Sequence, residues 1–101
     1  MSLSKIEEEF NKQTSSYIEE MYKALNTEIE YFYTIFSDIY IKSYPPQGDL
    51  LFKEEIIKDN YVLSTITAEY INKKIVIKRN RDGFKKYLEE SINKLEESFK
   101  E

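Results

Sequence analysis

The residues best suited to chemistry form a basic segment at positions 73–86. Five lysines and two arginines stand there against one aspartate, although the whole chain has a net charge of −4. Such a segment can bind phosphate groups, above all where lysines open a helix whose free N–H groups already attract anions. A solvated surface, with lysines that guard an exposed strand against aggregation, is the alternative. The candidate anion-binding or nucleic-acid-binding residues are Lys74, Lys78, Arg79, Arg81, Lys85 and Lys86.

A run of aromatic residues is the second candidate site. The stretch 29–41 has apolar side chains around most of its circumference as a helix, more than one small sheet can cover. Tyrosine suits a seam between two protein copies because its ring is apolar and its hydroxyl can stay hydrated. We therefore expect a homodimer, and a surface that binds itself or another protein. The candidate residues of this surface are Tyr31, Phe32, Tyr33, Phe36 and Tyr40.

The composition removes most catalytic chemistry. The chain has no His and no Cys, so neither a Ser-His-Asp nor a Cys-His site can be built, and thiolate metal sites are excluded. The acidic residues at 7–9, 19–20, 28 and 30 fit a solvated helix face, and no calcium-loop motif or glycine-rich phosphate loop is present. We therefore predict no enzyme, no metal and no cofactor. An enzyme that uses Glu or Lys would need carboxylates converging in a deep pocket.

The same composition suggests where the protein works. A small secreted domain usually needs disulfides, and this chain of 101 residues has no cysteine to form them. No apolar run approaches the length of a membrane span, and the N-terminus lacks a basic-then-apolar signal pattern. We expect a cytoplasmic protein of one domain, residues 1–101, with no membrane contact.

The N-terminal part of the chain predicts a long helix. A capping box at 4–7 starts it, apolar residues follow at helical spacing, and Pro45-Pro46 ends it. A strand is the rival interpretation of 29–41, but the spacing of its polar residues favours helix. A helix from 4 to 42 would be about 58 Å long, too long for a globule of about 13 Å radius of gyration. It either breaks near 13–16, where 16–19 offers a second capping box, or projects and pairs with a second copy.

A hairpin is the best-defined local element. The segments 61–71 and 74–80 alternate in polarity, and Asn72-Lys73 between them suits a two-residue turn. That turn pairs Ile71 with Lys74 and sets the register of both strands. One face then gathers the apolar side chains of Ile66, Ala68, Tyr70, Ile75 and Ile77.

These elements predict an α+β fold: a long N-terminal helix, a three-stranded antiparallel sheet at about 50–57, 61–71 and 74–80, and a C-terminal helix at about 82–100. A short helix is the alternative for 50–57, whose alternation is poor. The last helix, N-capped by Asp82, carries Phe84, Leu88, Ile92, Leu95 and Phe99 on one face. The predicted function is a small non-enzymatic protein-interaction module, homodimeric, with an unidentified protein partner. A nucleic-acid-binding regulator that uses 73–86 is the alternative.

Overall fold

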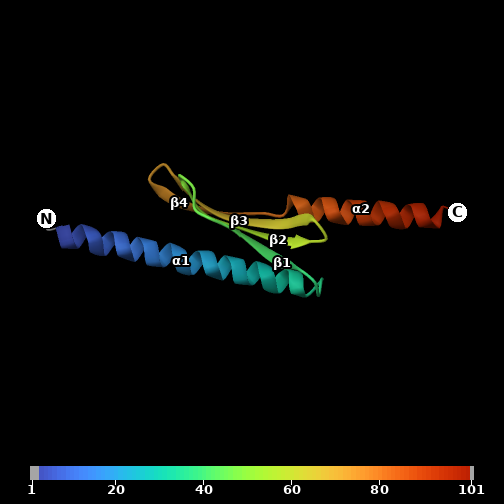
Figure 1. Ribbon diagram of the computed structural model, residues 1–101, viewed down its shortest axis with the longest axis horizontal. Helices are drawn as coiled ribbons and strands as arrows, with labels where there is room; N and C mark the ends of the chain where they lie inside the picture. Colours follow the sequence, from blue (N-terminus) through green and yellow to red (C-terminus); the bar gives the residue numbers. More distant parts are fainter. Residues whose placement is uncertain (1–2, 101) are drawn as a thin grey trace.

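The computed structural model describes the backbone of residues 3–100 and the side chains of residues 16–100. It confirms the α+β class, with a helix at each end and an antiparallel sheet between them (Figure 1). The strands lie in the order β1-β2-β3-β4, so each one pairs with the next along the chain. The elements are α1 (Leu3–Tyr33), β1 (Tyr40–Tyr44), β2 (Leu50–Lys58), β3 (Tyr61–Ile71), β4 (Lys74–Asn80) and α2 (Asp82–Phe99).

The β3–β4 hairpin has the predicted turn and register. Asn72 and Lys73 have φ angles of 50° and 64°, the left-handed conformation that a two-residue turn of this kind requires. Ile71 pairs with Lys74, and the predicted pairs continue to the far end of the hairpin. Figure 1 shows α1 along one face of the sheet. Ile66 and Ala68 are buried on the side of α1, whereas the same side is less covered toward the turn, where Tyr70 is exposed.

The prediction of three strands and of a helix through 29–41 is wrong. Helix α1 ends at Tyr33, and Tyr40–Tyr44 forms a fourth strand, β1, which pairs with β2 from Tyr40↔Ile57 to Tyr44↔Lys53. Tyr and Ile suit strands as well as buried helices. Pairing with β1 also satisfies the backbone groups of β2 that would otherwise form a bare edge. The segment 50–57 is strand, as favoured, and not a short helix.

Helix α1 is continuous through 13–16, so the predicted break is absent and the helix projects instead. Its 31 residues correspond to about 46 Å, and the molecule measures 76 × 24 × 17 Å with a radius of gyration of 18.5 Å. The second capping box, at 16–19, lies inside the helix and starts nothing. The side chains of the first box, at 4–7, lie outside the described residues.

Aromatic rings and a strand irregularity build the small core. Phe32, Ile56, Leu63 and Phe84 are buried together, and the rings of Phe32 and Phe84 meet edge to face at 5.1 Å. Between the pairs Ile56↔Ser64 and Ile57↔Val62, β3 carries one extra residue. Such a bulge lets two successive side chains turn to the same side. Leu63 and Ser64 are accordingly both buried.

The start of α2 differs in detail from the prediction. Arg81 occupies the N-cap position without a side-chain cap, and Asp82 is the first helical residue. The Asn80 Oδ1 atom accepts a hydrogen bond of 2.8 Å from the Asp82 N–H. The side chain of Asn80 thus satisfies one free N–H group at the start of the helix, which the side chain of Asp82 does not do. The next residue, Gly83, lies so close to β3 that a Cβ atom there would be 1.6 Å from the Val62 carbonyl oxygen.

We predict that Gly83→Ala destabilises the protein by about 3 kcal/mol, the upper range for overpacking, because backbone atoms stand in the way. Gly48→Ala is the matched control. Its φ is +59° and nothing lies within 4 Å of a new Cβ, so only the left-handed backbone penalty of about 1–2 kcal/mol applies. Urea unfolding measures both values. A Gly83→Ala effect no larger than that of Gly48→Ala would contradict the close packing of α2 on β3.

Candidate functional site

A buried carboxylate on α1 is the most enclosed ionisable group among the described residues. The side chain of Glu28 is 1% exposed and lies where α1, β3 and the start of α2 meet. The expectation of a solvated position is therefore wrong for Glu28, whereas Glu30 is exposed. Arg81 donates to both of its oxygens, from Nε to Oε2 at 2.8 Å and from Nη2 to Oε1. The Ser64 hydroxyl donates to Oε2 at 2.5 Å, and Arg79 Nη1 stands 3.7 Å from Oε1.

These contacts decide the protonation of Glu28. Burial opposes its ionisation, but hydrogen bonds from Arg81 and Ser64, with the charges of Arg81 and Arg79, outweigh burial and hold the pKa of Glu28 below its ordinary value. A carboxylate that is ionised, fully bonded and shielded from water is a poor proton acceptor. Glu28 is therefore a structural clamp between α1 and the β4–α2 junction, and not a catalytic base.

The predicted basic site is divided by the fold. Alternation along β4 sends Lys78 to the face away from α1, whereas Arg79 turns toward α1 and Glu28. Arg81 is also committed to Glu28, and its guanidinium lies 4.1 Å from the Tyr31 ring centre. Lys74 shares the face of Lys78, since both belong to the same alternation. The remaining members, Lys85 and Lys86, are exposed on the first turns of α2.

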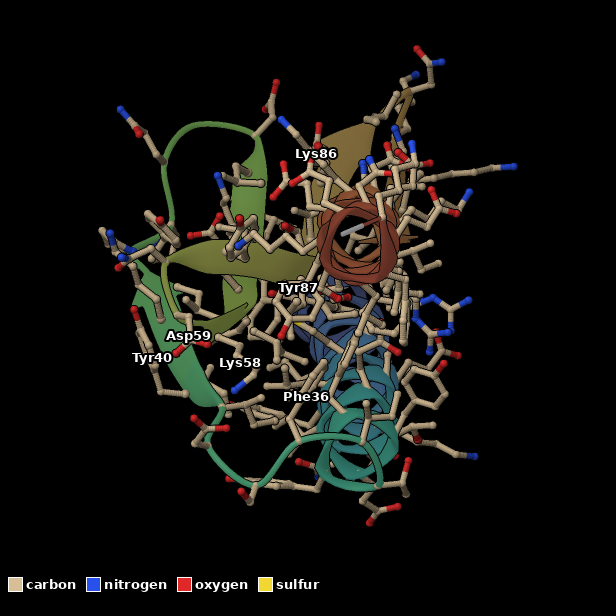
Figure 2. All side chains as sticks on the ribbon, turned by 90° about the vertical axis from the view of Figure 1, so that its right-hand side faces the viewer. Phe36, Tyr40, Lys58, Asp59, Lys86 and Tyr87 are labelled. Carbon is tan, nitrogen blue, oxygen red and sulfur yellow. The ribbon has the colours of Figure 1, made fainter. Side chains whose placement is uncertain are left out.

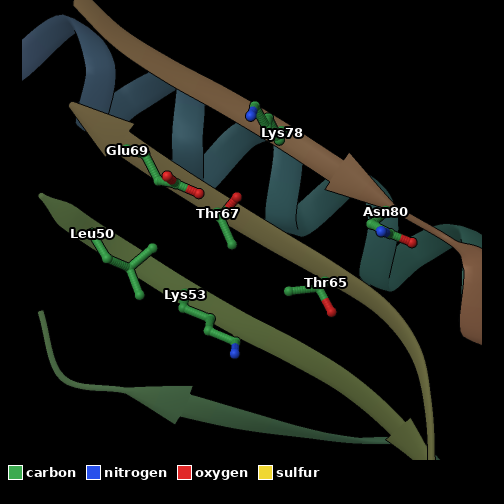
Figure 3. Close-up of a pocket in the computed structure, with 7 residues that line it drawn as sticks. All are labelled: Leu50, Lys53, Thr65, Thr67, Glu69, Lys78 and Asn80. Atoms are coloured by element: carbon green, nitrogen blue, oxygen red, sulfur yellow. The ribbon is translucent and has the colours of Figure 1, made fainter. Parts of the chain in front are cut away.

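The face of the sheet away from α1 is open, and we call it the open face. Figure 3 shows it toward the viewer with α1 behind the strands. It contains a groove of about 390 Å³ between β2, β3 and β4, whose walls include Lys53, Thr67 and Lys78. Sequence reasoning missed the contribution of Lys53 because it lies outside the basic segment. The register Lys53↔Thr67↔Lys78 brings it there.

The predicted aromatic surface is also divided. Phe32 is buried in the core and Phe36 is half-buried against the rings of Phe84 and Tyr87. Tyr31, Tyr33 and Tyr40 are exposed. Tyr31 borders the core through Phe84, at 6.3 Å between ring centres. Tyr40 lies at the start of β1, and Figure 2 shows it apart from Phe36, which lies on the side of the helices.

A second apolar surface lies on the face of α2 that the sequence spacing identified, and beyond Phe84 it is exposed. Its side chains follow the buried Phe84 along α2, and their exposed fractions rise toward the C-terminus as the helix leaves the rest of the molecule. We call these residues the α2 stripe: Leu88 at 41%, Ile92 at 52%, Leu95 at 59% and Phe99 at 84%. The spacing was visible in the sequence. The exposure of the α2 stripe follows from the direction of α2.

Lys58 lies beside two carboxylates, which neutralise its charge. Lys58 Nζ lies 2.6 Å from Asp38 Oδ1 and 3.5 Å from Asp59 Oδ2, and over the Phe36 ring at 5.2 Å (Figure 2). The hydrogen bond with Asp38 raises the pKa of Lys58 and lowers that of Asp38. Lys58 therefore stays protonated and is no nucleophile. Among the described residues no group of three carboxylates could hold a metal ion.

Comparison of the chain with protein-family models, with curated proteins and with solved structures gives no match. In the part of the chain that the structure describes, neither helix combines the length and apolarity needed to cross a membrane.

We predict that Glu28→Gln lowers stability at pH 7 by about 3 kcal/mol, since it leaves Arg81 without its charged partner. Because the folded pKa of Glu28 is depressed, its contribution is complete above the unfolded value of about 4.3 and disappears as pH falls through the folded pKa. Urea unfolding at pH 7, 5 and 3 should show the gap to the unsubstituted protein narrowing at low pH. Glu30→Gln, on the exposed side of α1, is the control. A gap of constant size would refute the clamp.

Proposed function

We propose that this protein is a small non-enzymatic interaction module that works as a homodimer through the α2 stripe and also binds another protein. The observation that carries the proposal is a continuous apolar stripe on α2 whose four side chains are all exposed, from 41% at Leu88 to 84% at Phe99. Soluble monomers rarely expose a contiguous apolar surface of this kind, and such surfaces are typically interaction sites.

The direction of α2 explains why the stripe is uncovered. Phe84 packs against the C-terminal end of α1, but α1 ends at Tyr33. From Leu88 onward, α2 runs past that end and away from the sheet (Figure 1). A helical segment of about 12 residues is marginal in water without tertiary packing. A partner that covers the stripe would supply the packing that α1 does not reach far enough to give.

The spacing of the stripe favours a second helix as this partner. Steps of four, three and four residues separate Leu88, Ile92, Leu95 and Phe99, the alternation of a coiled-coil seam. A second copy of the chain brings the same stripe, and a twofold axis pairs identical surfaces on both copies. Self-association is therefore the simplest way to cover it.

The size of the interface argues that α2 does not act alone. Stable dimers bury about 800 Å² on each partner, whereas residues 88–99 extend only about 17 Å along the helix. The exposed ring of Tyr31 adjoins Phe84 at the base of α2, and Tyr33 is exposed one half-turn further along α1. We infer that Tyr31 extends the seam onto α1, whereas Tyr33, about 200° away around the helix, points to another side and is left to a separate partner.

The absence of enzymatic activity remains part of the proposal. Its support is chemical: the chain lacks His and Cys, and the buried carboxylate and Lys58 are both held in ion pairs. A cytoplasmic location also belongs to the proposal, and it rests on the lack of cysteines for disulfides.

We predict that Leu95→Lys weakens the dimer at least about a hundredfold, because two copies each lose about 2 kcal/mol of apolar burial and bring two ammonium groups together. Asn93→Lys adds the same charge to the same helix on an exposed position outside the stripe, and should leave the dimer intact. Light scattering after gel filtration, over a range of protein concentrations, measures both. A monomeric unsubstituted protein at high concentration, or equal disruption by both variants, would rule out the seam.

A further inference from the structure

One row of side chains crosses the whole open face. Tyr44 on β1 pairs with Lys53 on β2, Lys53 pairs with Thr67 on β3, and Thr67 pairs with Lys78 on β4. Directly paired residues point to the same face, and four strands span about 14 Å. We call these four residues the cross-strand row. It carries a ring at one end, a cation next to it, a hydroxyl, and a second cation at the other end.

The cations of the open face are not neutralised in the way that Arg79 and Arg81 are. By the pairing of the strands, four lysines share this face, Lys42, Lys53, Lys74 and Lys78, with two glutamates, Glu55 and Glu69. Within the described residues none of the four lysines forms an ion pair. One of the two glutamates, Glu55, accepts a hydrogen bond from the Tyr44 hydroxyl. The face therefore has an excess of positive charge in an acidic protein.

Positive charge concentrates at the aromatic end of the row. The ammonium groups of Lys42 and Lys53 lie 5.0 Å and 4.7 Å from the centre of the same Tyr44 ring. The two cations are thus within about 10 Å of each other, a separation at which physiological salt screens their repulsion only in part. An anion bound between them would relieve that repulsion and free the ring for another planar group.

We propose that the open face binds single-stranded nucleic acid along the cross-strand row, independently of the dimer seam. Stacking on an aromatic ring and phosphate contacts from lysines are the two interactions that sequence-tolerant single-strand binders combine. Four-stranded sheets elsewhere present aromatic residues on an open face to stack bases. Here Tyr44 stacks a base, Lys53 and Lys78 bind phosphates on either side of the groove, and Thr67 between them offers a hydroxyl.

The Tyr44 ring favours single-stranded nucleic acid over two other anionic ligands, an acidic peptide and duplex nucleic acid. An acidic peptide would use the lysines but gain little from Tyr44. Duplex nucleic acid would offer phosphates but keep its bases stacked inside. The site also differs from the basic segment expected from the sequence. It gains Lys42, Lys53 and Tyr44 and excludes the two arginines, which the Glu28 clamp holds on the other face.

The test is the fluorescence anisotropy of a labelled thymidine oligonucleotide of about 12 residues, titrated with the full chain at low salt. We expect the logarithm of the association constant to fall linearly with the logarithm of the salt concentration. The expected slope is near −1.4, for two phosphate contacts by a single strand. Lys53→Glu with Lys78→Glu should abolish binding. Tyr44→Leu should weaken it at least about fivefold, the lower limit for the loss of one stacked base.

The matched control is Lys85→Glu with Lys86→Glu, which makes the same change in charge on the exposed start of α2 and should retain most of the binding. Lys53→Gln with Lys78→Gln gives a milder second variant, and circular dichroism reports whether each variant is folded. The proposal is overturned if the unsubstituted protein does not bind, or if the control loses as much affinity as the open-face variant. It is also overturned if duplex DNA or polyglutamate binds as tightly, or if Tyr44→Leu has no effect.

Discussion

The fold depends on the neutralisation of one buried negative charge. Glu28 is shielded from water near the C-terminal end of α1, and an uncompensated carboxylate there would cost several kcal/mol. Arg81 satisfies both of its oxygens from a position 53 residues later in the chain, immediately before α2. Ser64 adds a bond from the bulged part of β3. The same ion pair therefore fixes where α1 crosses the sheet and where α2 begins, and it brings Phe84 into the core.

The hairpin was predictable because residues close together in the sequence specify its turn and its register. The end of α1 depends on pairing between more distant segments, which the sequence patterns do not show. Asn72-Lys73 and the alternation on either side determine the register within twenty residues. The end of α1 depends instead on β2, which needs a partner strand and recruits Tyr40–Tyr44 from a stretch whose composition also suits a helix. The exposure of the α2 stripe has a simple cause that the sequence did contain. Only Arg81 separates β4 from α2, too little chain to turn the helix back over the sheet.

The candidate sites also divide into features that local sequence patterns predict and features that depend on contacts between distant segments. The basic segment is continuous in the sequence, but its predicted register already placed Lys78 opposite Thr67 and Arg79 opposite Ile66, on different faces. Applying that alternation to the charges would have separated them. The pairing of Arg81 with Glu28 and the arrival of Lys53 beside Lys78 could not be foreseen, because both depend on contacts between distant segments. The two proposed surfaces consequently lie on different parts of the molecule, one on a projecting helix and one on the sheet.

The contact between Gly83 and Val62 has a consequence for the variation of this sequence over evolution. Surface lysines and tyrosines can drift without loss of the fold, and even the α2 stripe can exchange one apolar residue for another. Position 83 has no such freedom, since any side chain there meets the backbone of β3. A glycine at the second position of a final helix that follows a strand after a single connecting residue should therefore persist in diverged descendants. It would identify this strand-to-helix junction after the rest of the sequence has changed beyond recognition.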